Sequence, residues 1–292
     1  MHPSSGPNVP VNNFKSLARI LTKVENELPE SDNILKNLTP KHTPVIGVTG
    51  PPGAGKSTLV NQLINTLSKE NKRIAILAID PSSPFNMGAL LGDRIRMAEQ
   101  FNKPNVFIRS LATRGSLGGV SAKTIQMTDV LKSADFDYIF IETVGVGQSE
   151  IEIVGVADIT IVVLVPEAGD EIQSIKSGLM EIADIFAINK ADRDGADLFA
   201  NTIQKLVHQK SKRIPVIKTI AERSEGISAL LEAIKSQPYS ENKRKLPLLF
   251  EKAWKLIQDK RMSDIDKKKL QQAITEASKQ IDFNLYRFIE KF

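Results

Sequence analysis

The chain contains no cysteine and only three histidines among its 292 residues. The lack of cysteine excludes disulfides and thiolate metal sites, and His2, His42 and His208 are too far apart in sequence to have the spacing of metal ligands. No apolar run approaches the roughly 20 residues that a membrane-spanning helix needs. The polar, Pro-rich first ten residues also lack the layout of a secretory signal. We therefore expect a cytoplasmic protein that does not act at a membrane.

The positive charge of the chain comes from a single region. The sequence has 39 Lys and Arg against 34 Asp and Glu, a net charge of +5. Residues 241–269 contain ten of the basic and five of the acidic residues, so they account for the whole excess. A surface that binds nucleic acid is usually basic over a broader area. A solvated helical face explains the charge better, and no nucleic-acid partner is expected.

Short apolar runs rich in Ile and Val alternate with segments of helical periodicity. The runs do not alternate between apolar and polar residues, which is typical of strands covered on both faces. The expected strands are Val45–Thr49, Arg73–Asp80, Asn105–Leu111, Asp137–Thr143, Asp158–Pro166, Asp184–Lys190 and Pro215–Ile220. The expected helices are Lys56–Lys69, Gly88–Phe101, Ser121–Ser133, Glu171–Ile182, Ala196–Lys210 and Ile227–Ser236. This alternation predicts an α/β fold with a doubly wound, mostly parallel sheet, although the order of its strands cannot be read from the sequence.

Helical extensions flank this domain, which we place at residues 41–238. Residues 1–40 are expected to form a tail followed by an amphipathic arm, whose helically spaced apolar residues are Leu17, Ile20, Leu21, Val24 and Leu28. Residues 239–292 carry two further stripes. The first consists of Leu249, Phe250, Trp254 and Ile257, and the second of Leu270, Ile274, Ala277, Ile281, Leu285 and Phe288. The second stripe packs either on its own domain or on a second subunit in a homodimer.

A glycine-rich loop lies between the first expected strand and the first helix of the domain. The pattern Gly-x-x-x-x-Gly-Lys-Ser in this context predicts a phosphate-binding loop, because its backbone N–H groups and the helix N-terminus attract phosphate oxygens. Lys56 should bridge the β- and γ-phosphates, and the Ser57 hydroxyl should bind Mg²⁺. The expected nucleotide-binding residues are Gly50, Pro51, Pro52, Gly53, Ala54, Gly55, Lys56, Ser57 and Thr58.

The sequence Asn189-Lys190-Ala191-Asp192 ends another expected strand. The Asp192 carboxylate can accept hydrogen bonds from N1–H and the exocyclic amine of guanine, a pair of donors that adenine does not present. The Lys190 stem can cover the base, and Asn189 can tie this loop to the phosphate side. After the next strand, a backbone N–H of Ile220, Ala221 or Glu222 is placed to meet the guanine O6. These residues predict GTP and GDP rather than ATP as the bound nucleotides.

Three carboxylates are expected where a Mg²⁺ ion and its waters would lie, two of them at the ends of strands and the third in the segment Gly92–Met97. They are Asp80, Asp93 and Glu142, and with Ser57 they form the expected metal site, with several ligands supplied by water. Glu142 opens a glycine-rich segment through Glu150 that is typical of a γ-phosphate sensor, in which Gly145, Gly147 and Gln148 form a switch. Lys56, Asp93 and Glu142 are the expected catalytic residues. Because no general base is evident, we expect slow intrinsic hydrolysis that a partner accelerates.

Together these motifs resemble the SIMIBI class of P-loop GTPases, and most of all the MeaB/MMAA type, also called ArgK. The most specific segments are Gly50–Thr58, Asp80–Pro84, Gly92–Met97, Thr113–Gly119 and Glu142–Glu150. The resemblance implies a homodimeric, Mg²⁺-dependent GTPase that binds an adenosylcobalamin-dependent acyl-CoA mutase of the methylmalonyl-CoA mutase type. Members of the family act as chaperones that gate loading of the cofactor and protect the mutase.

Two alternative functions use the same loop. A metal-insertion maturation GTPase would carry its metal on Cys and His clusters, which this sequence does not supply. A transport-associated ATPase or kinase, as the older description of the family has it, would need an acceptor site and a base, and would not benefit from a guanine motif. The chaperone function is therefore the favoured hypothesis.

Overall fold

The computed structural model describes most of the chain, and the chain divides into two compact units, residues 1–248 and 249–292. The description covers residues 13–80, 97–112, 122–143, 153–166, 179–208, 214–238, 250, 253–254, 256–258, 260–280 and 283–290. Each unit is considered by itself below. Within the described residues, no helix is long and apolar enough to cross a membrane.

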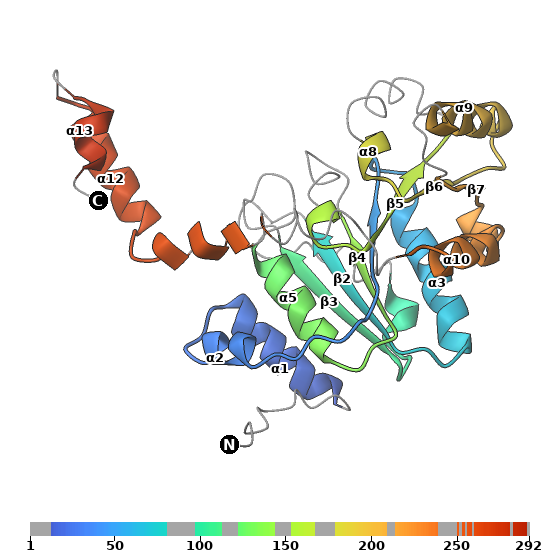
Figure 1. Ribbon diagram of the computed structural model, residues 1–292, viewed down its shortest axis with the longest axis horizontal. Coiled ribbons are helices and arrows are strands. Elements are labelled where there is room, and N and C mark those ends of the chain that lie inside the picture. Colours follow the sequence, from blue (N-terminus) through green and yellow to red (C-terminus); the bar gives the residue numbers. More distant parts are fainter. Residues whose placement is uncertain are drawn as a thin grey trace. The chain divides into compact units, whose positions relative to one another are not determined.

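The first unit is built on a seven-stranded sheet in which every neighbouring pair of strands is parallel. Its order is β3-β2-β4-β1-β5-β6-β7 (Figure 1). The strands are β1 Val45–Thr49, β2 Ile74–Asp80, β3 Val106–Ala112, β4 Tyr138–Glu142, β5 Ile159–Leu164, β6 Ile185–Ile188 and β7 Val216–Lys218. Each of them overlaps one of the apolar runs, so the predicted α/β fold is confirmed.

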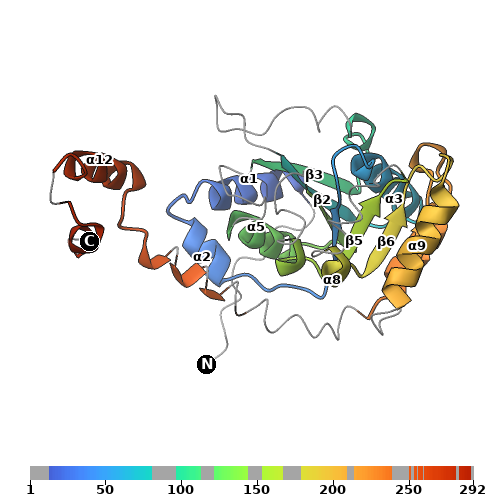
Figure 2. The ribbon, with the colours of Figure 1, turned by 90° about the horizontal axis from the view of Figure 1, so that it is seen from above.

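Helices cover both faces of this sheet. On one face, α3 (Lys56–Lys69) and α10 (Ile227–Lys235) pack against Ile46 and Val48 of β1. On the other face, α1 (Phe14–Glu25) and α5 (Ala122–Ser133) pack against Val45, and α8 (Met180–Ile182) and α9 (Ala196–His208) pack against β5 and β6. Figure 2 shows α1 at the β3 end of the sheet and α9 at the β6 end. Successive residues of a strand point to opposite faces of the sheet, and helices cover both faces. The apolar residues therefore follow one another without alternating with polar ones.

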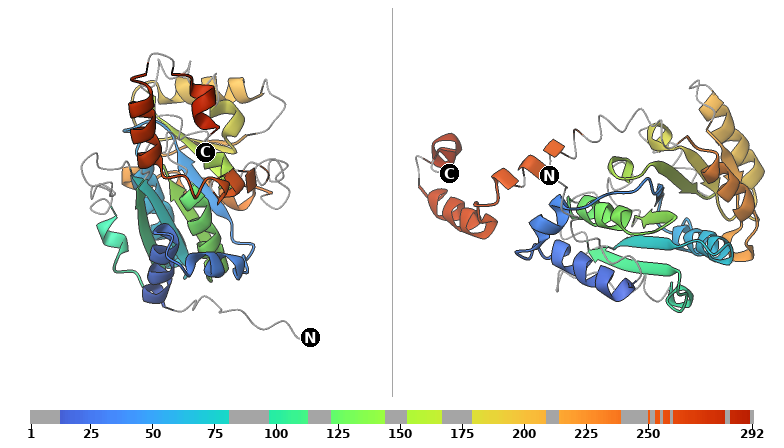
Figure 3. Two further views of the ribbon diagram at one scale, coloured as in Figure 1. Left: turned by 90° about the vertical axis from the view of Figure 1, so that its left-hand side faces the viewer. Right: turned by 60° about the horizontal axis from the view of Figure 1, so that its bottom comes forward.

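The N-terminal arm consists of two helices rather than one. Helix α1 ends in a Schellman motif, in which Glu27 has a left-handed φ of 51° and the Leu28 N–H bonds to the Lys23 carbonyl at 3.0 Å. This turn separates α1 from α2 (Ser31–Lys36) and leaves Leu28 41% exposed. The prediction that Leu28 continues the buried stripe is therefore wrong, whereas Leu17 lies in the core. The right-hand view of Figure 3 shows α1, in blue, beside the green α5.

Two of the predicted helices are described only at their C-terminal ends. Of Gly88–Phe101, the structure describes residues from 97 onward, where Ala98–Gln100 forms the 3-10 helix η1 and Phe101 lies in a turn. Of Glu171–Ile182, it describes the end, which contains α8. Two more 3-10 helices, η2 (Ile153–Gly155) and η4 (Ala221–Arg223), pack near β1 and α3.

The second unit contains α12 (Lys267–Ala277) and α13 (Leu285–Ile289), whose N-caps are the side chains of Asp266 and Asn284. No residue of α12 is buried, and Phe288 of α13 is. The described part of this unit exposes several large apolar side chains, namely Phe250, Trp254, Ile257, Met262, Leu285, Tyr286 and Ile289. The predicted stripe from Leu270 to Phe288 is thus divided between two helices. Its role in a homodimer remains a prediction.

Candidate nucleotide-binding site

The phosphate loop joins the carboxyl end of β1 to the start of α3. Gly50, Gly53 and Gly55 all have positive φ values, and α3 begins at Lys56, directly after the last of these glycines. The buried Lys56 ammonium donates to the Gly50 carbonyl at 2.8 Å and to the Pro51 carbonyl at 2.9 Å. The cation therefore lies over the loop, where a phosphate held by the loop N–H groups would be within its reach.

The sheet register brings Glu142 to the phosphate loop. Glu142 ends β4 opposite Val48 of β1, and its carboxylate Oε1 accepts a 2.5 Å hydrogen bond from the Ser57 hydroxyl at the start of α3. Glu142 is buried. Mg²⁺ prefers oxygen ligands such as these two, so the pair fits the expected metal. In the described part of the chain, neither here nor at any other place do three or more acidic or His side chains form a group that could hold a metal ion.

The other residues expected around Mg²⁺ and the γ-phosphate fall outside the described structure. The backbone of Asp80 ends β2, beside β4, but its side chain lies outside the described residues. Asp93, Gly145, Gly147 and Gln148 lie outside them entirely, as do residues 113–119. Their assignment to the metal site and the switch stays a prediction.

Asn189 connects the phosphate loop to the guanine side of the site. Its amide nitrogen donates to the Ala54 carbonyl at 2.8 Å. Its side-chain oxygen accepts from the Ala221 N–H at 3.1 Å and from the Thr219 hydroxyl at 3.2 Å. The side chain is buried, so each of these bonds is shielded from water. The segment predicted to bind guanine is thereby fixed relative to the phosphate loop.

The segment after β6 places Asp192 at the surface of the site. Lys190 adopts a left-handed φ of 56°, and the Ala191 N–H bonds to the Thr219 carbonyl at 3.1 Å. The Asp192 side chain is 39% exposed and lies 3.9 Å from the Arg223 guanidinium. A weak, exposed pair of this kind leaves the carboxylate accessible to a base.

Two of the three N–H groups considered for guanine O6 are engaged within the protein. Ile220 donates to the Glu225 carbonyl at 3.1 Å, and Ala221 donates to Asn189. Of the three, Glu222, which lies in η4, is the residue to which the predicted O6 contact is best assigned.

Sequence reasoning did not single out Thr219 or Arg223 as site residues. Thr219 bonds to Asn189 and lies at the carboxyl end of β7. Its position directly after a strand, at the edge of the sheet that carries the nucleotide site, could have identified Thr219 as a site residue from the sequence. The approach of Arg223 to Asp192 depends on the path of the chain through η4, which no local pattern indicates.

A matched pair of glycine substitutions tests how closely Asn189 holds the loop. Gly53 and Gly55 have similar φ values, +79° and +84°, so alanine carries about the same backbone strain of roughly 1–2 kcal/mol at either position. At Gly55 the added Cβ would lie within 2.4 Å of Asn189 Nδ2, whereas at Gly53 no atom lies within 4 Å. We expect Gly55→Ala to lower the free energy of unfolding by about 2 kcal/mol more than Gly53→Ala does, because Asn189 must give up buried hydrogen bonds. Urea unfolding of both variants measures the difference, and equal losses would contradict the role given to Asn189.

The described fold and site place the chain among known proteins. Residues 17–277 match the family model described as methylmalonyl Co-A mutase-associated GTPase MeaB. A Pyrococcus horikoshii protein named "Putative GTPase PH0274" is 47% identical over 230 residues, which cover 76% of this chain and 73% of that protein. The mouse protein named methylmalonic aciduria type A homolog, mitochondrial, is 39% identical over 199 residues, which cover 65% of this chain and 48% of the mouse protein.

The fold has counterparts among solved structures. A crystal structure of a LAO/AO transport system kinase superposes with a TM-score of 0.68 at 24% identity, over 93% of this chain and 85% of that one. The parallel sheet and phosphate loop, with these relatives, define a P-loop GTPase of the SIMIBI class. The chain belongs to the MeaB family.

Proposed function

We propose that this protein is a Mg²⁺-dependent GTPase that serves as a chaperone of an adenosylcobalamin-dependent acyl-CoA mutase, of the methylmalonyl-CoA mutase type. The observation that carries the proposal is the match of residues 17–277 to a family described by its association with that mutase. The name of the mouse relative, which refers to methylmalonic aciduria, supports the same connection. In this function the GTPase gates loading of the cofactor and protects the mutase.

The described residues have distinct tasks in this function. Lys56, which lies over the phosphate loop, neutralises charge on the β- and γ-phosphate oxygens. Ser57 and Glu142 would hold Mg²⁺, together with Asp80 and Asp93, and the ion would offset the negative charge that develops on the phosphates. Asp192 selects guanine.

Hydrolysis by the isolated protein is proposed to be slow. Glu142 and Asp93 orient the attacking water, while Gly145, Gly147 and Gln148 respond to the γ-phosphate and signal its presence to the partner. The protein is proposed to act in the cytoplasm as a homodimer. The exposed apolar side chains of the second unit, among them Trp254 and Tyr286, support a contact between subunits.

Mixing the protein with an adenosylcobalamin-dependent methylmalonyl-CoA mutase from the same organism tests the chaperone function. We expect the two proteins to co-elute in size-exclusion chromatography. We also expect the rate of GTP hydrolysis to rise by about tenfold or more, because partner contacts complete the catalytic arrangement. ATP serves as the control nucleotide, and an adenosylcobalamin-independent CoA enzyme serves as the control protein.

The outcomes distinguish the two parts of the proposal. No co-elution and no stimulation with such a mutase would overturn the chaperone function, even if GTP were still hydrolysed. Equal stimulation by the control protein would have the same meaning, since the effect would then lack specificity.

A further inference from the structure

A hollow of about 380 Å³ opens at the edge of the sheet opposite to the phosphate loop. It lies where β1, β4 and β5 begin and where α3 and α10 end, whereas the loop follows the carboxyl end of β1. We call it the basal hollow. Its volume is in the range of small-molecule sites. None of the residues assigned to GTP or Mg²⁺ lines it, so it is a separate feature of the first unit.

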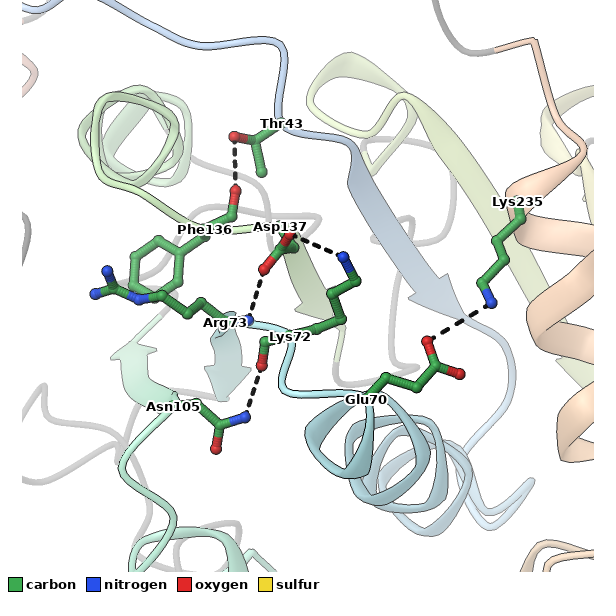
Figure 4. Close-up of polar contacts among 8 residues, drawn as sticks. All are labelled: Thr43, Glu70, Lys72, Arg73, Asn105, Phe136, Asp137 and Lys235. Atoms are coloured by element: carbon green, nitrogen blue, oxygen red, sulfur yellow. Dashed lines mark hydrogen bonds and ion pairs between the residues drawn. The ribbon is translucent and has the colours of Figure 1, made fainter.

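The end of α3 places Lys72 at the rim of the basal hollow. Asn71, with a left-handed φ of 58°, forms a Schellman motif in which the Lys72 N–H bonds to the Leu67 carbonyl at 3.1 Å. The chain then turns into β2, and Asp137 Oδ2 accepts the Arg73 N–H at 2.7 Å. The other oxygen of Asp137 faces the Lys72 ammonium (Figure 4). Asp137 is therefore already engaged in holding this turn.

The lysines at the rim are held loosely. Lys72 lies 3.4 Å from Asp137, and Lys235 lies 3.7 Å from Glu70 and 3.3 Å from Glu232, all longer than the roughly 2.8 Å of a strong charge-assisted bond. The two side chains are 42% and 36% exposed, and pairs this exposed contribute little to stability. Figure 4 shows Lys72 and Lys235 on either side of the start of β1. Both ammonium groups can turn toward a ligand at small cost.

The lining of the basal hollow combines basic and apolar residues. Lys41, His42, Lys72 and Lys235 line it with a single carboxylate, that of Asp137. The Lys41 ammonium is already paired with Asp135 at 2.7 Å, so Lys72 and Lys235 are the cations offered to a ligand. Burial raises the pKa of the Tyr138 phenol, which therefore keeps its proton as a hydrogen-bond donor. The hydrogen bond to Glu232 raises the pKa of Lys235, which keeps that side chain charged. The apolar part is formed by Pro44, Ile159 and Ile234.

We propose that the basal hollow binds a small organic anion, a phosphate monoester or carboxylate on an apolar body. The anionic head would lie between Lys72 and Lys235, and the body would rest on Pro44, Ile159 and Ile234. Lysines also occur at helix C-termini to offset the partial negative charge there, and α3 and α10 both end here. That purely structural role requires no ligand, so the test must detect binding directly.

The test is a titration of the full chain, saturated with GDP and Mg²⁺, with phenyl phosphate and separately with benzoate. The readout is the ring signal of His42 by NMR, because the chain has only three histidines and His208, on α9, serves as an internal reference. We expect a saturable shift of the His42 signal with one or both anions, no shift of His208, and none of either with benzyl alcohol. The readout does not depend on GTP hydrolysis.

Two variants complete the test. Replacing Lys72 and Lys235 together by glutamine should weaken binding of the anion about a hundredfold, since each of the two charged hydrogen bonds is worth about tenfold. Lys205→Gln, an exposed change on α9, should leave the affinity unchanged. Absence of a saturable His42 shift in the wild-type protein would overturn the proposal, as would a shift that the double substitution does not weaken. If the wild type binds no anion and the double variant only melts at a lower temperature, the two lysines serve only to stabilise the ends of the helices.

Discussion

Lys56→Ala is expected to lower the affinity for GTP and GDP by about a hundredfold, because it removes two charge-assisted contacts to phosphate oxygens. The lysine contacts the Gly50 and Pro51 carbonyls across the loop rather than joining the apolar clusters of the core. Loss of those contacts should change the free energy of unfolding by only about 1 kcal/mol. Isothermal titration with GDP and thermal melting measure the two quantities on the same sample.

Lys69→Ala is the matched control for this prediction. Lys69 is exposed at the other end of the same helix, so its replacement should leave GDP affinity unchanged. If Lys56→Ala bound GDP as tightly as the wild type, the phosphate-binding role of the loop would be contradicted. If the variant unfolded instead, Lys56 would be a structural residue.

Asp192→Asn is expected to change the preferred base from guanine to xanthine. The carboxylate is predicted to accept hydrogen bonds from N1–H and the exocyclic amine of guanine. An amide can keep only part of that pattern, so GDP affinity should fall about a hundredfold. Xanthine carries a carbonyl oxygen where guanine has the amine, and the asparagine NH₂ can donate to it. The exposed, 3.9 Å pair of Asp192 with Arg223 contributes little, so the fold should be unaffected.

Competition between GDP and xanthosine diphosphate for a fluorescent nucleotide measures this exchange. Asp194→Asn removes an exposed carboxylate two residues away and should leave both affinities as in the wild type. A variant at Asp192 that lost both nucleotides equally would show that the residue supports the loop instead of reading the base.

Local patterns predicted the strands and their parallel sheet well, but not the order of the strands. The central strands β1, β5 and β6 are buried at every residue, so their sequences are apolar without alternation, and that property can be read from a few consecutive residues. The position of β4 between β2 and β1 depends on pairings such as Val48 with Glu142, which join residues far apart in the chain. The prediction of one continuous helical arm at the N-terminus was wrong, because local spacing did not reveal a turn of the backbone. The helical spacing of this arm continued through Leu28 although the backbone turned at Glu27.

The candidate site was predictable as a set of residues but not as a connected structure. The phosphate loop and the Asn-Lys-x-Asp sequence can be recognised because backbone geometry and base recognition require those residue types at fixed spacing. A tie from Asn189 to the phosphate side was expected, but its bonds to Thr219 and Ala221 and the contact of Ser57 with Glu142 depend on the folded sheet. The three hydrogen bonds of Asn189, to Ala54, Thr219 and Ala221, join segments that lie far apart in the sequence.

The central claim, that this site binds and hydrolyses GTP, is tested most directly by measuring phosphate release from GTP and from ATP under identical conditions with Mg²⁺. The wild-type protein should release phosphate from GTP, slowly when alone and faster with its mutase, and should release far less from ATP. The Lys56→Ala variant serves as the negative control for phosphate release. Equal rates with the two nucleotides, or GTP turnover that survives in Lys56→Ala, would contradict the account.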